Sequence, residues 1–180
     1  MNARDIEIAV AKHFNPRANI IVPNVSWGLF NNREVDVLVV RPSGFAVEVE
    51  IKTTAADIKR DLKKHRHYID SRGWHGDRDK IREKYFAVPE ALTSHPDIPA
   101  ECGIISVGES EGDYWPWHQV KRRSKLNKNA RRLTPAEIHH VMELGLMRIW
   151  TLKESLRRAQ SKAISPGDRE TNKSHKEAQS

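Results

Sequence analysis

The stretch Glu34–Lys52, EVDVLVVRPSGFAVEVEIK, decides the fold of this chain. On both sides of Arg41-Pro42-Ser43-Gly44 the side chains follow a period of two, which is typical of β-strands. Proline at the second turn position and glycine at the fourth suit a type I turn that ends in a left-handed residue. The stretch therefore predicts an antiparallel hairpin.

A three-residue loop in this hairpin sets the register of its two strands. A two-residue loop would shift every pair by one residue and would separate the facing acids. With the three-residue loop, the facing pairs are Arg41 with Phe45, Asp36 with Glu50, and Glu34 with Lys52. The register therefore predicts a concentration of charge near the open end of the hairpin.

Glu48, Glu50 and Lys52 share one face of the second strand, and Asp36 faces Glu50 across the pair. Two facing carboxylates repel each other unless a cation lies between them, and Mg²⁺ binds carboxylate oxygens together with waters and substrate phosphate. Lys52 would orient or deprotonate a metal-bound water, or neutralise charge on a phosphorus centre. The alternative is the solvated face of an ordinary hairpin.

Asp36, Glu50 and Lys52 resemble the core motif of the PD-(D/E)xK nuclease superfamily, with Val35 in place of the proline that often precedes the first acid. The similarity extends through EVEIKTTAADIKRDLKKHRHY, KYFAVPEAL and CGIISV, which resemble the MmcB-like DNA-repair group and related phage proteins. It covers about residues 5 to 107. The resemblance implies a restriction-endonuclease-like fold and a metal-dependent nuclease that acts on DNA in repair, recombination or phage DNA processing.

The resemblance also implies the roles of individual residues. Asp36 and Glu50 would hold Mg²⁺, or Mn²⁺ in its place, with the backbone carbonyl of Ile51 as a further ligand, and Lys52 would position the attacking water. The remaining candidates are Glu34, Glu48, Glu7 on the first helix, and Asp61 with Lys64 on the helix after Lys52. The alternatives are a solvated helix acid for Glu7 and a salt-bridged helix face for Asp61 and Lys64.

Length and composition limit the classes of protein that this chain can belong to. Its 180 residues suit one domain, and a net charge of +7 with a pI of about 9.6 indicates a polyanionic partner. The single Cys102 excludes an internal disulfide and a thiolate zinc site. We expect no membrane span or signal peptide and a cytoplasmic location, because no apolar run is long enough.

The segment Lys121–Arg132, KRRSKLNKNARR, carries seven basic residues in twelve positions and no acid. Such a dense run predicts contacts with phosphate and carries no base specificity by itself. The predicted DNA-binding residues are Lys121, Arg122, Arg123, Lys125, Lys128, Arg131 and Arg132.

The whole pattern predicts an α/β fold with a mixed sheet of about five strands flanked by helices. Besides the hairpin, strands are expected at 19–25, 84–88 and 102–107, and helices at 3–14 and after Thr54. Thr134-Pro135-Ala136-Glu137 is a strong helix start and begins a long C-terminal helix. We expect the nuclease-like domain to cover 1–158 and a disordered polar tail to cover 159–180.

The sequence leaves three functional alternatives. The first is a Mg²⁺-dependent deoxyribonuclease, and the second is a DNA-binding adaptor on the same fold that does not cleave. RNA as the target is the third, because phosphate chemistry does not distinguish the two nucleic acids. A homodimer is also left open, since a monomer does not readily cut both strands of a duplex.

Overall fold

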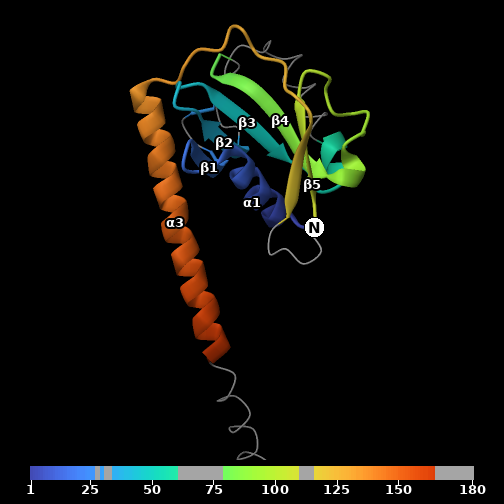
Figure 1. The fold of residues 1–180 in the computed structure, drawn as a ribbon. Coiled ribbons are helices and arrows are strands. Elements are labelled where there is room, and N and C mark those ends of the chain that lie inside the picture. The colour runs from blue at the N-terminus through green and yellow to red at the C-terminus, as the bar shows by residue number, and fades with distance from the viewer. Residues whose placement is uncertain (27–28, 31–33, 61–78, 110–115, 165–180) are drawn as a thin grey trace, which may run out of the picture. The chain divides into compact units, whose positions relative to one another are not determined.

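A computed structural model of the chain describes residues 1–26, 29–30, 34–60, 79–109 and 116–164. These residues form a mixed α/β fold around a six-stranded sheet in the order β1-β2-β3-β4-β5-β6, shown in Figure 1. The predicted α/β class, the mixed sheet and the long C-terminal helix are confirmed. The sheet has one strand more than we expected.

The strands follow one another across the sheet in the order of the sequence. They are β1 (Ile20–Val25), β2 (Val35–Val40), β3 (Ala46–Ile51), β4 (Ile81–Pro89), β5 (Gly103–Gly108) and β6 (Trp117–Arg122). Neighbours are antiparallel from β1 to β3 and between β5 and β6, whereas β3, β4 and β5 are parallel. The chain therefore crosses over twice, through residues 52–80 and 90–102, and the second crossover contains the short 3-10 helix η1 (Glu90–Leu92).

Two strands differ from the sequence prediction. β4 begins at Ile81, three residues earlier than expected. β6 was not predicted, because its sequence WHQVKR is polar and carries the first residues of the basic segment. As an edge strand it is half solvated, and none of its residues is fully buried.

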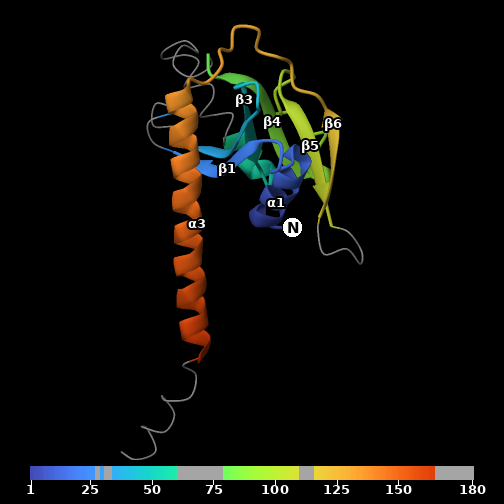
Figure 2. The same cartoon turned by 60° about the vertical axis from the view of Figure 1, so that its left-hand side comes forward.

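Helix α1 (Ala3–Phe14) begins with a capping box in which Asn2 and Asp5 each accept a hydrogen bond from the other's backbone amide. Its apolar stripe packs against one face of the sheet. Figure 1 and Figure 2 show the helix on this face. The core on this face includes Ile6, Val10, Val47 and Val49. Because side chains alternate along a strand, Glu48 and Glu50 of β3 point to the other face.

Helix α3 (Pro135–Ile164) starts at the predicted capping box, where Glu137 N–H donates to the Thr134 hydroxyl and the Glu137 carboxylate accepts from the Thr134 amide. The helix continues to Ile164, so residues 159–164, which we assigned to a disordered tail, are helical; residues 165–180 lie outside the described part. The chain divides into two compact units, Met1–Gly145 and Leu146–Ser180. Within the described residues, no helix is both long enough and apolar enough to cross a membrane.

Candidate active site

The hairpin of β2 and β3 has the predicted register. Arg41 N–H donates to Phe45 C=O, Gly44 N–H donates to Arg41 C=O, and Gly44 has a φ of 81°. The ladder runs from Val40 opposite Ala46 to Val37 opposite Val49. The turn thus fixes the pairing that leads toward the expected acids.

The ladder of backbone hydrogen bonds ends one pair before Asp36 and Glu50, and the next hydrogen bond between the two strands is made by a side chain. The Asp36 carboxylate accepts a hydrogen bond of 2.7 Å from the Ile51 N–H. A backbone amide at a strand end otherwise needs a partner from the neighbouring strand or from water. Asp36 is therefore fixed against the end of β3, and its carboxylate lies at the point where the two strands stop pairing.

Lys52 joins the two acids of the motif. Its ammonium lies 2.8 Å from the Glu50 carboxylate and 3.7 Å from the carboxylate oxygen of Asp36 that binds Ile51. Its backbone N–H donates to Ala87 C=O of β4, which holds the end of β3 against the sheet. The structure therefore brings Asp36, Glu50 and Lys52 together, with Asp36 the most exposed of the three side chains at 34%.

Behind this group lie Glu48, which was among the predicted candidates, and Lys84, which the sequence analysis missed. Lys84 of β4 is the register partner of Glu48, and its ammonium lies 2.7 Å from the Glu48 carboxylate and 3.8 Å from that of Glu50. A lysine directly before the apolar run Tyr85–Val88 was the available signal. Five side chains thus alternate in charge, and we call them the acid–lysine chain: Glu48, Lys84, Glu50, Lys52 and Asp36.

The acid–lysine chain holds three carboxylates and two ammonium groups, and most of it is buried. Burial raises the pKa of Glu50 to about 7, and the negative charge of Glu48 adds to the shift, while Lys84 and Lys52 oppose it. An acid with this pKa is ionised only in part at neutral pH. The acid–lysine chain therefore has one more carboxylate than it has ammonium groups, and an additional cation would stabilise it.

Asp36 and Glu50 are the residues best suited to hold a divalent cation. Mg²⁺ is commonly bound by one or two carboxylates, with the remaining positions filled by water, carbonyl oxygens or phosphate. Among the described residues, no group of three or more His, Cys, Asp or Glu could hold a metal ion. A two-carboxylate site with the Ile51 carbonyl and waters is the donor set that these residues offer.

Other predicted residues lie apart from this group or outside the described part. Glu34 is exposed directly before β2, while Lys52, its expected partner, pairs with Glu50 and Asp36. The ladder of β2 and β3 ends before Glu34 and Lys52, so their expected pairing stays a prediction. Asp61 and Lys64 lie outside the described residues.

Glu7 of α1 is half-buried and lines a hollow of about 160 Å³ with Ile21 and Val37. Burial raises the pKa of its carboxyl group, Arg4 opposes the shift, and the charge of Asp36 adds to it. Glu7 is therefore within electrostatic reach of the site, although it lies on the helix that covers the other face of the sheet.

The helix that follows Lys52 begins as predicted. Residues 55–60 are helical, Asp57 N–H donates to the Thr54 hydroxyl, and this hydroxyl donates to the Asp57 carboxylate. The hydrogen bond from the Thr54 hydroxyl to the carboxylate is the main cause that lowers the pKa of Asp57. Asp57 thus acts as part of the helix cap.

The structure divides the basic segment into cations with structural partners and exposed cations. Arg122 donates to Cys102 C=O at 2.8 Å and to Pro99 C=O at 2.7 Å, so it closes the crossover before β5. Lys121 lies 3.7 Å from the Glu90 carboxylate, and Arg132 lies over the ring of Phe45. Arg123, Lys125 and Lys128 are exposed and are the members of the segment best placed to meet phosphate.

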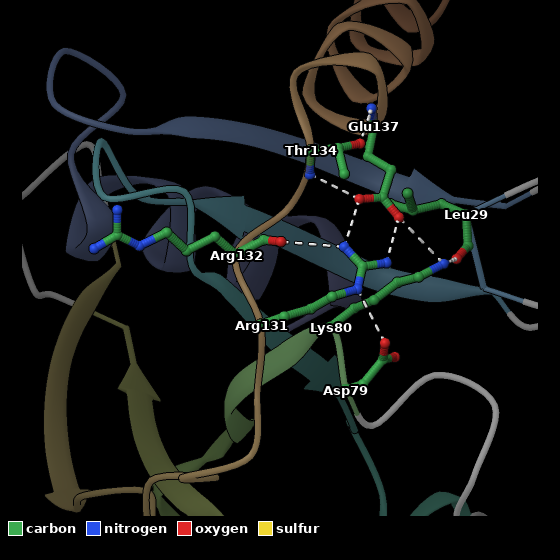
Figure 3. Close-up of polar contacts among 7 residues, drawn as sticks. All are labelled: Leu29, Asp79, Lys80, Arg131, Arg132, Thr134 and Glu137. Carbon is green, nitrogen blue, oxygen red and sulfur yellow. Dashed lines mark hydrogen bonds and ion pairs between the residues drawn. The ribbon is translucent and has the colours of Figure 1, made fainter.

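Arg131 has a structural role that its position in a basic run does not indicate. Its guanidinium donates to both carboxylate oxygens of Glu137 at 2.7 Å and to the Asp79 carboxylate at 3.0 Å, as Figure 3 shows. The Lys80 ammonium lies 3.5 Å from Glu137 and also donates to Leu29 C=O. We call Arg131, Glu137, Asp79 and Lys80 the Arg131 clamp. Arg131, which we had predicted to bind DNA, is thus paired with two carboxylates of the protein.

The basic segment passes along the edge of the sheet where β3 and β4 begin, above the sheet in Figure 1. Leu133 N–H donates to Gly44 C=O. At the start of β4, Asn127 N–H donates to Arg82 C=O and the Asn127 side-chain amide donates to Ile81 C=O. Ser124, between Arg123 and Lys125, accepts a hydrogen bond from the Lys84 N–H. Two of the exposed cations, Arg123 and Lys125, are thus sequence neighbours of Ser124, which binds the backbone of Lys84.

Comparison with solved structures supports the class of fold that these elements define. The chain is similar to the SPO1766 protein of unknown function from Silicibacter pomeroyi, at 18% sequence identity and a TM-score of 0.57, over 94% of this chain and 98% of that one. At this identity the similarity concerns the fold alone. No protein-family model matches the chain, and no curated protein matches it.

Proposed function

We propose that this protein is a metal-dependent nuclease that hydrolyses phosphodiester bonds in DNA. The observation that carries the proposal is the convergence of Asp36, Glu50 and Lys52 at the end of the β2–β3 ladder. The same three residues carry the resemblance to the PD-(D/E)xK superfamily. The excess of acid in the acid–lysine chain supports a site that binds a cation.

In this proposal, Asp36 and Glu50 bind Mg²⁺ or Mn²⁺, with the Ile51 carbonyl as a further ligand. The bound ion would act as a Lewis acid toward a phosphate oxygen and lower the pKa of a water. Lys52, whose ammonium contacts both acids, would orient the attacking water and stabilise the charge that develops on the phosphate. The Ile51 N–H keeps Asp36 in position for this task.

The basic segment supplies the contact with the DNA backbone. Arg123, Lys125 and Lys128 are exposed, and cations of this kind bind phosphate without reading sequence. Ser124 connects the segment to Lys84 of the acid–lysine chain. This contact is the observed link between the basic segment and the proposed site.

The test is cleavage of labelled single-stranded, duplex, nicked and branched DNA, with a labelled RNA beside them, in Mg²⁺ or Mn²⁺. Wild type is compared with Asp36→Asn and Lys52→Ala, and with Glu154→Gln as a matched control on the exposed surface of α3. We expect wild type and the control to cut a DNA substrate and both site variants to lose at least about a hundredfold in rate. Binding without cutting by wild type would contradict the proposal and favour a DNA-binding adaptor, and cutting of RNA alone would replace DNA as the substrate.

A further inference from the structure

We propose that Lys84 is a positioning residue of this site, which holds the Glu50 carboxylate in the orientation that binds a cation together with Asp36. The inference rests on the proposed nuclease function and extends it to a residue outside the motif. Its basis is the geometry of β3 and β4, which are parallel neighbours.

The parallel register places Lys84 between two acids of β3. Glu48 is its direct partner, and Glu50 is the partner of Phe86, two residues further along β4. The Lys84 ammonium lies 2.7 Å from Glu48 Oε1 and 3.8 Å from Glu50 Oε1, and 5.8 Å from the centre of the Phe86 ring. The other oxygen of Glu50, Oε2, lies 2.8 Å from Lys52. Glu50 is therefore held from two sides.

Glu48 is the anchor of Lys84 and is not suited to bind a cation from solvent. Its exposed fraction is 1%, and its carboxylate binds the lysine. Two buried carboxylates that lie two residues apart on one face of a strand repel each other. Lys84 is the group between them, so its loss would leave Glu50 facing Glu48 and would favour rotation of the Glu50 side chain away from its present position.

The backbone of Lys84 is fixed as well. Pairing of β4 with β5 begins at Tyr85, one residue later. The Lys84 N–H instead donates to the hydroxyl of Ser124 at 3.0 Å. The lysine is thus held at its backbone by the basic segment and at its ammonium by Glu48, which is the rigid support that a positioning residue needs.

The experiment measures Mn²⁺ binding to the full chain by calorimetry at one fixed pH, together with thermal unfolding. The variants are Lys84→Met, Lys84→Arg and Asp36→Asn, and Lys80→Met is the matched control. Lys80 is also a partly buried lysine beside a carboxylate, but its partner is Glu137 of the Arg131 clamp. We expect Lys84→Met to weaken Mn²⁺ binding about tenfold to a hundredfold, Lys84→Arg to restore part of it, and Lys80→Met to lower the unfolding temperature with unchanged Mn²⁺ affinity.

The two proposals fail in different ways. Wild type that neither binds Mn²⁺ nor cuts DNA would overturn the nuclease and this inference together. Wild type that binds Mn²⁺ in an Asp36-dependent way, with equal affinity in Lys84→Met, would overturn the inference alone and leave Lys84 a structural residue. If Lys84→Met does not fold, Glu48→Gln/Lys84→Met buries no unpaired charge and replaces it. Its Mn²⁺ affinity should also fall below that of wild type, because the Oε1 atom of Glu50 still lacks the contact with Lys84, and an unchanged or higher affinity would overturn the inference.

Discussion

The acid–lysine chain and the Arg131 clamp both surround a carboxylate with cations, yet the two carboxylates respond in opposite directions. The pKa of Glu137 is held well below its usual range, chiefly by hydrogen bonds from Arg131. The pKa of Glu50 is raised to about 7, chiefly by burial and then by Glu48. Both acids have basic partners, so the presence of a cation does not decide the outcome.

The difference lies in how many carboxylates share the cations and how deeply they are buried. Glu137 receives a bidentate pair from Arg131 and a backbone N–H from Thr134, and it remains partly exposed. Glu50 is almost fully buried next to a second buried acid. The Arg131 clamp is therefore satisfied by the protein itself, whereas the acid–lysine chain has a remaining demand for positive charge. We infer that the Arg131 clamp stabilises the fold and that the acid–lysine chain binds a cation.

The largest expected effect is on activity, from Glu50→Gln. Cleavage should fall about a hundredfold or more, because a charged ligand of the proposed cation is lost. Without divalent cations, the unfolding temperature should stay the same or rise, because a buried carboxylate that resists ionisation is replaced by a neutral amide. Cleavage assays and thermal melts in EDTA measure the two quantities. A large loss of stability with intact cleavage would reverse our assignment of roles.

The second effect is the converse one, from Arg131→Ala. We expect a loss of about 2 kcal/mol in the free energy of unfolding, because the variant leaves the partly buried Glu137 without its bidentate partner. Cleavage by the folded protein should be unchanged. Urea unfolding measures the loss, and Lys128→Ala, an exposed cation of the same segment, should stay within about 0.5 kcal/mol of wild type.

A third prediction uses pH to separate the two clusters. The folded pKa of Glu137 lies below its ordinary value of 4.5, so the stability that it contributes is present above that pH and is lost as the pH falls. The difference in unfolding free energy between wild type and Glu137→Gln should therefore narrow in acid. For Glu50, whose folded pKa is raised from 4.5 to about 7, stability should fall as the pH rises through that window.

These two pH dependences call for a measurement in EDTA. Urea unfolding of wild type, Glu137→Gln and Glu50→Gln at several pH values gives the differences directly. The difference in unfolding free energy between wild type and Glu50→Gln should change with pH in the opposite direction to the difference for Glu137→Gln. A change in the same direction would show that burial does not dominate in the acid–lysine chain.

The smallest expected effects come from the exposed cations. Lys125→Ala and Lys128→Ala should each weaken DNA binding severalfold, whatever the sequence, and lower the salt dependence of binding by about one phosphate contact. Arg122→Ala, whose guanidinium binds Cys102 C=O and Pro99 C=O, should mainly reduce stability. Fluorescence anisotropy over a series of salt concentrations distinguishes the two cases, and equal salt slopes for Lys125→Ala and wild type would remove Lys125 from the interface.

The features that the sequence predicted are those that depend on local chemistry. The turn at Gly44 fixes the hairpin register, and the period of two fixes which side chains share a face, so the neighbourhood of Asp36, Glu50 and Lys52 followed from nearby residues. The capping box at Thr134 and Glu137 is local in the same way. It also offered an unused signal for the Arg131 clamp, because it places a carboxylate six residues after Arg131.

The features that were missed depend on contacts between distant parts of the chain. Lys84 meets Glu48 only through the parallel register of β3 and β4, which the crossover through residues 52–80 connects. No spacing within either strand reveals that register. The polar strand β6 is defined by its pairing with β5, because its sequence lacks the apolar alternation that marks the other strands. The restriction-endonuclease-like assignment and the homodimer stay predictions.

The parallel pairing of β3 with β4 also bears on how the chain reaches its native state. The hairpin that carries Asp36, Glu48 and Glu50 closes over a few residues, whereas Lys84 arrives only after a loop of nearly thirty residues has closed, and such closure is slow. Lys52 belongs to the hairpin and contacts Glu50 and Asp36, but Glu48 and Glu50 gain the ammonium of Lys84 only when β4 has paired with β3. We therefore expect the repulsion between Glu48 and Glu50 to be stronger before β4 pairs than in the finished sheet, where Lys84 opposes it. Refolding should then be faster in high salt or in Glu48→Gln than in the wild-type chain at low ionic strength.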